Sequence, residues 1–163
     1  MFGKNENNEE NSEKTQEKAE FSSNKYKIDE KTAEMEFNNF CEMWDIDNDI
    51  SQMDEEDKDG FRKNKSSIVK AFRQGRLIID REKRTLIYTI SDFSEEKRGE
   101  TLTIRRLKGA DYMAADNYKE KDLVHKSYSV LASMVGRPTS YISSLDNNDL
   151  KVLQACMILF SQG

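Results

Sequence analysis

Apolar residues between positions 30 and 74 recur with the spacing of helices. One set consists of Phe37, Phe40, Cys41 and Trp44, and a second inner face is marked by Phe61, Lys65, Ile68 and Phe72. Residues spaced by three and four positions lie on one side of a helix, so two amphipathic helices are predicted here. The acidic stretch 45–49 separates them. Gly75 stands where the second helix needs a left-handed C-terminal cap.

The pattern changes to that of β-strands after Gly75. Three runs rich in β-branched and aromatic residues follow: RLIID at 76–80, TLIYTI at 85–90 and TLTIRRL at 101–107. A charged turn and a polar loop separate the runs, which therefore predict a three-stranded antiparallel meander over 76–107. Three strands are stable when helices cover one face of their sheet.

The chain from 110 to 161 returns to helical spacing. Two helices are predicted over 111–121 and 122–135, either separate or continuous. A short helical turn is predicted over 141–145. The inner face of the second is marked by Val124, Tyr128, Leu131 and Val135. Gly136 and Pro138 punctuate its end.

The last predicted helix is apolar on more than one side. Asn147 or Asn148 caps it, and its core stripe consists of Leu150, Leu153, Met157 and Phe160. A helix that is apolar nearly all round is either buried or covered by a partner. The apolar residues outside the stripe are therefore the predicted partner-binding residues: Val152, Ile158 and Leu159.

This order of elements predicts an α+β fold, because the helices at 30–74 and 110–161 are segregated from the meander between them. Residues 1–25 are almost entirely Asn, Glu, Lys and Ser. Ordering them costs more entropy than their few apolar groups return, so they are expected to form a disordered polar tail. A single α+β domain is predicted over 26–163.

Charge and cysteine content narrow the class of protein. Asp and Glu outnumber Lys and Arg by 31 to 26, which argues against a general nucleic-acid binder. Cys41 and Cys156 each fall in an apolar helical pattern, as buried free thiols in a reducing compartment do. No apolar run follows Met1, and none reaches the roughly 18 residues of a membrane span. A cytoplasmic protein without a membrane partner is expected.

The acidic stretch 45–56 resembles a calcium-binding loop in part. Asp45, Asp47, Asp49 and Glu56 occupy the first, third, fifth and twelfth positions of such a loop. The sixth position, which requires glycine for its sharp turn, is Ile50, and a second loop to pair with it is not found. Ser51 to Asp54 also has the pattern of a helix N-cap, which explains the acids without a metal. A solvated loop between helices is expected.

Residues for catalysis are not found in a recognisable pattern. His125 is the only histidine, which excludes a histidine pair for zinc, and phosphate-binding and metalloprotease motifs are absent. A helical histidine at the solvent edge is expected, with no enzymatic activity and no cofactor. The basic pairs 83–84 and 105–106 lie beside Asp80, Glu82 and Glu100, so cross-strand ion pairs are expected there.

The C-terminal half contains a series of short segments with a recognisable order: Gly75-Arg-Leu77, Leu102-Thr-Ile-Arg105 to Asp111, Gly136-Arg-Pro138, Leu145 to Asp149, and Phe160. In these segments the chain resembles the tail assembly chaperone family of contractile-tailed, Mu-like phages. The resemblance covers about residues 68–161. The family has a proline after the strand where this chain has Leu107 or Lys108, and its short members lack the helical segment 30–66 and the tail.

The resemblance implies a protein that binds another protein in the host cytoplasm. Such chaperones coat the long, helical, aggregation-prone tape-measure protein while the tail tube polymerises, and the finished particle lacks them. A helix-in-groove mode of binding is expected. The alternative is a structural part, such as a baseplate or connector protein, of a phage tail or a related contractile injection particle.

Overall fold

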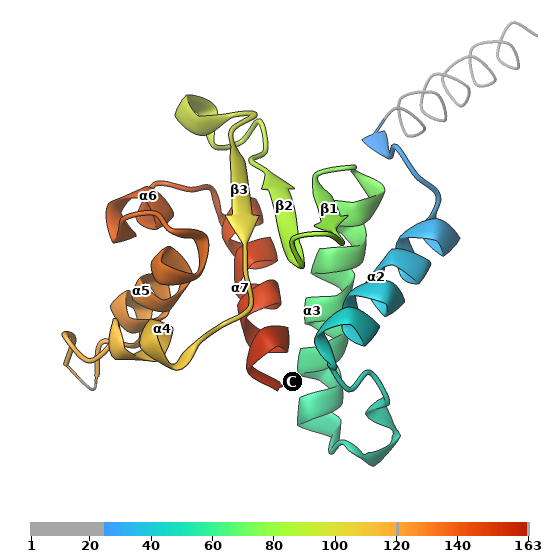
Figure 1. Cartoon of the computed structure of the whole chain (residues 1–163), viewed down its shortest axis with the longest axis horizontal. Helices are drawn as coiled ribbons and strands as arrows, with labels where there is room; N and C mark the ends of the chain where they lie inside the picture. The colour runs from blue at the N-terminus through green and yellow to red at the C-terminus, as the bar shows by residue number, and fades with distance from the viewer. Residues whose placement is uncertain (1–24, 120, 163) are drawn as a thin grey trace, which may run out of the picture.

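The computed structural model describes residues 25–119 and 121–162, and helices flank a small sheet on both sides in this part of the chain (Figure 1). The elements before the sheet are α2 (Glu30–Trp44), the 3-10 turn η1 (Ile50–Gln52) and α3 (Glu55–Arg73). The sheet contains β1 (Leu77–Asp80), β2 (Thr85–Thr89) and β3 (Thr101–Ile104), with the 3-10 turn η2 (Glu95–Lys97) before β3. The elements after it are α4 (Gly109–Met113), α5 (Leu123–Val135), α6 (Thr139–Ser143) and α7 (Asn147–Gln162). The predicted α+β class is confirmed, whereas the predicted tail lies outside the described residues except for Lys25.

The three strands form the predicted antiparallel meander in the order β1-β2-β3. Leu77 pairs with Tyr88, and Tyr88 pairs with Leu102, so these three side chains lie on one face of the sheet and are buried. Ile78 and Ile87 alternate with them on the opposite face, where Ile78 is exposed. The third strand ends at Ile104 rather than at 107, because Arg105 leaves the sheet to bind Asp111.

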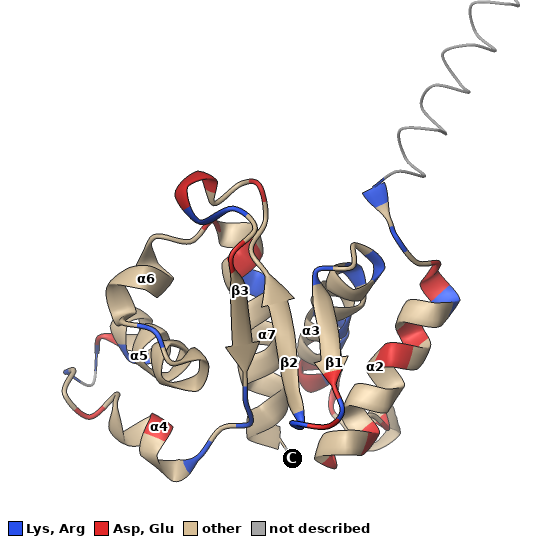
Figure 2. Ribbon diagram, turned by 45° about the horizontal axis from the view of Figure 1, so that its top comes forward, with Lys and Arg blue, Asp and Glu red and all other residues tan. Residues whose placement is uncertain are grey.

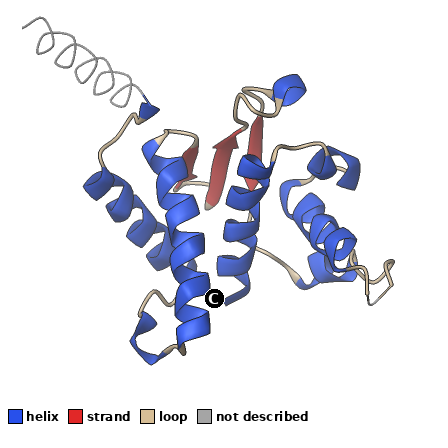
Figure 3. Cartoon of the chain, turned by 180° about the vertical axis from the view of Figure 1, so that it is seen from behind, coloured by secondary structure: helices blue, strands red, loops and turns tan. Residues whose placement is uncertain are grey.

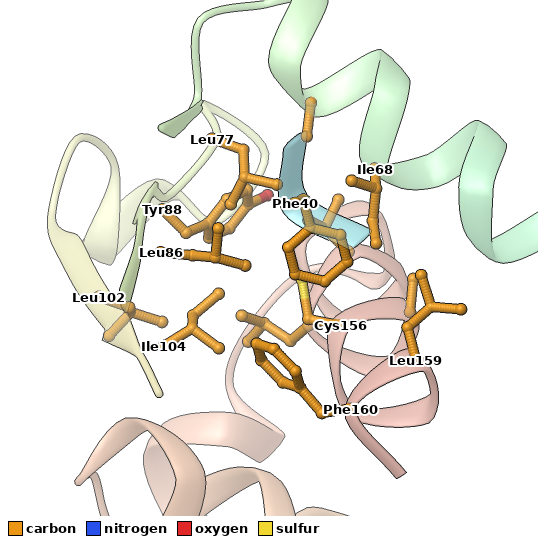
Figure 4. Close-up of a cluster of buried hydrophobic side chains, with 14 of the residues drawn as sticks. Phe40, Ile68, Leu77, Leu86, Tyr88, Leu102, Ile104, Cys156, Leu159 and Phe160 are labelled. Carbon is orange, nitrogen blue, oxygen red and sulfur yellow. The ribbon is translucent and has the colours of Figure 1, made fainter. Parts of the chain in front are cut away.

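Helices α3 and α7 lie side by side against the buried face of the sheet (Figure 3). Side chains of the strands, of α3 and of α7 point toward one another in this layer (Figure 4). The aromatic rings of α2 close the core, since Phe40 and Trp44 lie 5.5 and 5.7 Å from Phe160 between ring centroids. The predicted stripe of α2 is therefore confirmed as core.

Helix α3 begins and ends close to where its sequence predicts. Asp54 accepts a hydrogen bond from the backbone N–H of Asp57, which caps the N-terminus. Gly75 has a φ of +64°, and a Cβ at this position would approach the side chain of Lys27 to 2.6 Å. The positive φ favours glycine after the helix, and a side chain here would also displace that of Lys27. Lys65 lies at the edge of the inner face, where it forms an ion pair with Glu34 at 2.6 Å.

Two predictions for the C-terminal helices are wrong in detail. Apart from α4 and the undescribed position 120, the segment 109–122 consists of turns, so the predicted helix over 111–121 is not formed. None of residues 114–119 is buried, so a longer helix would gain no core contacts to stabilise it. At the start of α7, Asp146 rather than Asn147 or Asn148 accepts a hydrogen bond from a helix N–H, that of Asn148.

Candidate functional site

The predicted partner-binding residues of α7 do not form a surface. Val152 and Leu159 are 4% and 0% exposed, and only Ile158 reaches solvent, at 37%. The helix is enclosed because α3, the sheet and the aromatic rings of α2 pack around it (Figure 4). Val152 and Leu159 are thus core residues of this chain, and the prediction that they bind a partner is wrong.

The described residues include eight large apolar side chains that are exposed, and half of them belong to the segment from α4 to the start of α5. Four lie within 112–124, and we name them the α4–α5 apolar patch: Tyr112 (48% exposed), Met113 (67%), Leu123 (71%) and Val124 (61%). The other exposed large apolar residues, Met35, Ile78, Phe93 and Ile158, are spread over separate elements. Single exposed apolar residues are normal on a protein surface, whereas a local concentration marks an interaction site.

A buried carboxylate fixes the corner on which this patch stands. Asp111 is 1% exposed and accepts hydrogen bonds from both terminal nitrogens of Arg105, at 2.7 and 2.6 Å. The hydroxyl of Ser133 in α5 donates to the same carboxylate at 2.6 Å, and so does the backbone N–H of Lys108 at 2.7 Å. The hydrogen bonds from the Arg105 guanidinium are the main reason why the pKa of Asp111 is held well below its ordinary value.

This network joins β3, α4 and the C-terminal half of α5 through one side chain. Arg105 also donates to the backbone oxygen of Ser133 at 2.9 Å. The expected cross-strand ion pair of Arg105 is therefore wrong, because its partner lies six residues later in α4. A bidentate arginine–carboxylate pair has a fixed geometry, so the neighbouring Tyr112 and Met113 are presented on a rigid support.

The opposite end of the patch is the N-terminus of α5. Asp122 caps this helix by accepting from the backbone N–H of His125, and its carboxylate lies 2.7 Å from Nδ1 of the same histidine. The His125 ring stacks on Tyr118 with 5.7 Å between centroids. The predicted exposed position of His125 is confirmed, since its side chain is 59% exposed. Leu123 and Val124 are the first residues of the helix and point away from the core.

The side chain of the single histidine is exposed, whereas both cysteines are buried. In the part of the chain that the structure covers, the only side-chain hydrogen-bond partner of His125 is Asp122. Cys41 and Cys156 are buried free thiols, as predicted, and burial raises the pKa of each to about 12. Thiols with such pKa values are poor nucleophiles at neutral pH.

A second buried carboxylate, Asp149, joins α7 to the loop after β2. It is 0% exposed and accepts five hydrogen bonds, from Arg76, Tyr88, the backbone and hydroxyl of Ser91, and Ser94. Burial raises the pKa of Asp149, but the hydrogen bonds from the two serines and the tyrosine outweigh it, so the pKa lies below its ordinary value. Both carboxylate oxygens are fully occupied, which gives Asp149 a structural role.

The acidic loop 45–56 uses its carboxylates as caps. Asp47 accepts from the backbone N–H of Asp49, and Asp49 accepts from that of Ser51. Asp45 closes α2 in the left-handed conformation, and Asp54 opens α3. Over residues 25–119 and 121–162, His, Cys, Asp and Glu do not gather in groups of three that suit a metal ion. Likewise, none of the described helices is long and apolar enough to cross a membrane.

Sequence reasoning missed the α4–α5 apolar patch, although a signal was present. Tyr112 and Met113 are adjacent, as are Leu123 and Val124, and neither pair has apolar partners on both sides at helical spacing. Val124 was assigned to the inner face of α5, which the exposed position of its side chain corrects. The arrangement of an anchored corner and unburied apolar groups is suited to binding another protein. Comparison of the chain with protein-family models, curated proteins and solved structures gives no match.

Proposed function

We propose that this protein is a phage tail assembly chaperone, which binds the tape-measure protein through the α4–α5 apolar patch and keeps it soluble during assembly. The observation that carries the proposal is that four exposed large apolar residues, Tyr112, Met113, Leu123 and Val124, fall within one short segment, next to the anchored Asp111. Burial of apolar surface is the main favourable term in protein association. Met113 adds a flexible, polarisable side chain that adapts to varied partner surfaces.

The resemblance of residues 68–161 to the chaperone family supports the proposal. Three charged residues among those that carry the resemblance hold the fold together. Arg105 and Asp111 bind each other, and Asp149 binds the loop after β2. The motif therefore describes how the sheet is joined to the helices after it, and the patch lies directly beyond that junction. A helical partner with a repeating apolar stripe is the ligand that such a corner suits.

Co-expression with the tape-measure protein of the same gene cluster tests the proposal. The tape-measure protein should move from the insoluble to the soluble fraction and co-purify with several copies of this chain. The complex should survive moderate salt, because apolar burial is little affected by ionic screening.

The copy number in mature particles separates the chaperone from the structural alternative. Quantitative mass spectrometry of purified particles should detect none of this protein. A fixed copy number per particle, or an unchanged solubility of the tape-measure protein, would instead favour a baseplate or connector component.

A further inference from the structure

A groove between α3 and α7 carries a charge opposite to that of the whole protein. It runs along the face on which these two helices lie side by side, and we define it as the surface between 62–74 of α3 and 148–158 of α7 (Figure 3). Its lower part has a volume of about 540 Å³ and contains Arg62, Lys63 and Lys151. Its upper part, of about 200 Å³, shares Lys151 and adds Lys25, Lys70 and Arg76. Neither part is lined by a described Asp or Glu, although the protein has a net charge of −5.

Three of these cations have no carboxylate partner among the described residues. The ion pairs found there involve neither Lys63, Lys70 nor Lys151, and all three side chains are exposed. The neighbouring surface of α2 and α3 differs, because Lys65 and Arg73 bind Glu34 and Glu30 there. Lys63 and Lys70 also border neighbouring hollows that contain carboxylates, at the N-termini of α3 and α2. Within the groove itself the three lysines face no described carboxylate, and such a surface attracts an acidic ligand.

The chain enters the described structure at the upper end of this groove. Lys25 lines it, and the next residues are fixed to the C-terminus of α3. The backbone N–H of Lys27 donates to the oxygen of Arg73 at 2.7 Å, and the Arg73 guanidinium lies 4.0 Å from the centroid of the Tyr26 ring. The residues before Lys25 are therefore tethered at the mouth of the groove.

The residues before Lys25 are rich in glutamate, whose charge is opposite to that of the lysines in the groove. Residues 1–24 contain Glu6, Glu9, Glu10, Glu13, Glu17 and Glu20 and only three lysines, at 4, 14 and 18. From these observations we infer that the acidic segment 1–24 docks onto the α3–α7 groove of its own chain, with its glutamates against Lys63, Lys70 and Lys151. The apolar side chains at the two ends of the groove, Phe93 and Ile158, offer contacts for the few apolar residues of the segment, among them Phe21.

The segment is long enough to reach along the groove, and its covalent attachment gives it a high effective concentration there. The stretch 62–74 of α3 extends over about 18 Å at the rise of a helix. Residues 13–24 span that distance whether helical or extended, since an extended chain covers about 3.3 Å per residue. A short tether gives an effective concentration on the order of millimolar, so a weak contact per glutamate is sufficient for occupancy. The contact makes the groove an intramolecular site that an acidic partner segment has to compete for.

Paramagnetic relaxation in the full chain tests the inference directly. A nitroxide is attached to Ser12→Cys, and Cys41 and Cys156 do not interfere because both are buried. The amide signals of Ser66 and Gln154 in the groove should lose most of their intensity, whereas those of Thr103 and Val124 should keep it. The double variant Lys63→Glu/Lys151→Glu should restore the groove signals, as should about 1 M salt, where the Debye length is about 3 Å.

A charge-matched control and a mixing experiment complete the test. Lys83→Glu/Lys119→Glu changes the net charge equally outside the groove and should leave the broadening unchanged. Uniform broadening, no broadening, or broadening that survives reversal of Lys63 and Lys151 would overturn the inference. Broadening in a mixture of isotope-labelled chains and separate spin-labelled chains would also overturn it, because the segment would then bind a second copy.

Discussion

The two helical flanks of the sheet cover their apolar residues in different ways. On the α2–α3 flank, ion pairs such as Lys65–Glu34 and Lys58–Glu55 lie over an aromatic core. On the α4–α6 flank, α5 carries a single lysine and α6 no charged residue, and the charges lie mainly on α4 and the loops beside it (Figure 2). One buried ion pair, Arg105–Asp111, fixes that flank from inside. Apolar groups are therefore left at its surface, in the α4–α5 apolar patch.

This difference suggests that the α2–α3 flank is a solvated surface, whereas the α4–α6 flank is suited to binding another protein. Surface ion pairs contribute little to stability but keep a face solvated and unattractive to other proteins. A flank that is fixed by a buried carboxylate needs no such surface to hold its shape. The following predictions test that difference, beginning with the largest effect.

Leu159→Asp should prevent folding, whereas Ile158→Asp should be tolerated. Leu159 is fully buried, and an unpaired charge there costs several kcal/mol, a large share of the roughly 5–15 kcal/mol that stabilises a domain. Ile158 is 37% exposed, so an aspartate remains hydrated. Thermal unfolding followed by circular dichroism should show no cooperative transition for the first variant. Equal stability of the two would contradict the position of α7 in the core.

Asp149→Asn should destabilise the protein by about 3–5 kcal/mol, as breaking a buried charged pair does. The amide cannot accept all the hydrogen bonds that now reach the carboxylate, and Arg76 loses its counter-charge. Urea unfolding at neutral pH measures the loss. Asp146→Asn is the neighbouring control, because that side chain bonds only to Asn148 and should change the free energy of unfolding by less.

Asp111 should make stability depend on pH in the acid range. Its pKa is below the ordinary 3.8 in the folded state, so its contribution is present above that value and is lost as the pH falls below it. Asp111→Asn should cost about 1–3 kcal/mol at neutral pH, because the charged partner Arg105 is left unpaired. The difference from the unchanged chain should narrow as the pH falls below 3.8 toward the lowered pKa of the folded state, where the carboxylate becomes protonated. A difference that does not vary with pH would show that the ionised carboxylate contributes nothing.

Calcium should not bind with sensor affinity to the acidic loop 45–56. Asp47 and Asp49 already accept backbone hydrogen bonds, and Ile50 stands where a calcium loop needs glycine. Calorimetric titration should show no saturable binding tighter than about 10⁻⁴ M, the weak end for such loops. A micromolar isotherm that Asp47→Ala abolishes would instead indicate a calcium-responsive protein.

The elements on the α2–α3 flank and in the sheet are those that the sequence predicts best. Their apolar spacing is regular, and the caps at Asp54 and Gly75 are local signals. The run 85–90 forms β2 as predicted, and its alternate residues Leu86 and Tyr88 face the core. Local periodicity is sufficient where each element buries one clear face.

The helices after the sheet, α4 to α7, were harder to predict because their structure depends on distant partners. Asp149 is buried only because Arg76, Tyr88 and Ser91, which are 58 to 73 residues away, converge on it. The turns after Met113 make no buried contact with the rest of the molecule, which propensity alone does not show. A helix that is apolar on all sides is either buried within its own chain or covered by a partner. The packing of α3 against α7 shows that Leu159 is buried within this chain.

The most direct test of the central claim is the solubility of the co-expressed tape-measure protein with Met113→Asp/Leu123→Asp. The control is Met35→Asp/Ile78→Asp, which adds the same charge at two exposed apolar residues of the other flank and the sheet. Both variants should keep their stability within about 0.5 kcal/mol, as surface changes do. The α4–α5 variant should leave the tape-measure protein insoluble, whereas the control should keep it soluble. Equal solubility with both variants would contradict the assignment of the α4–α5 apolar patch as the binding surface.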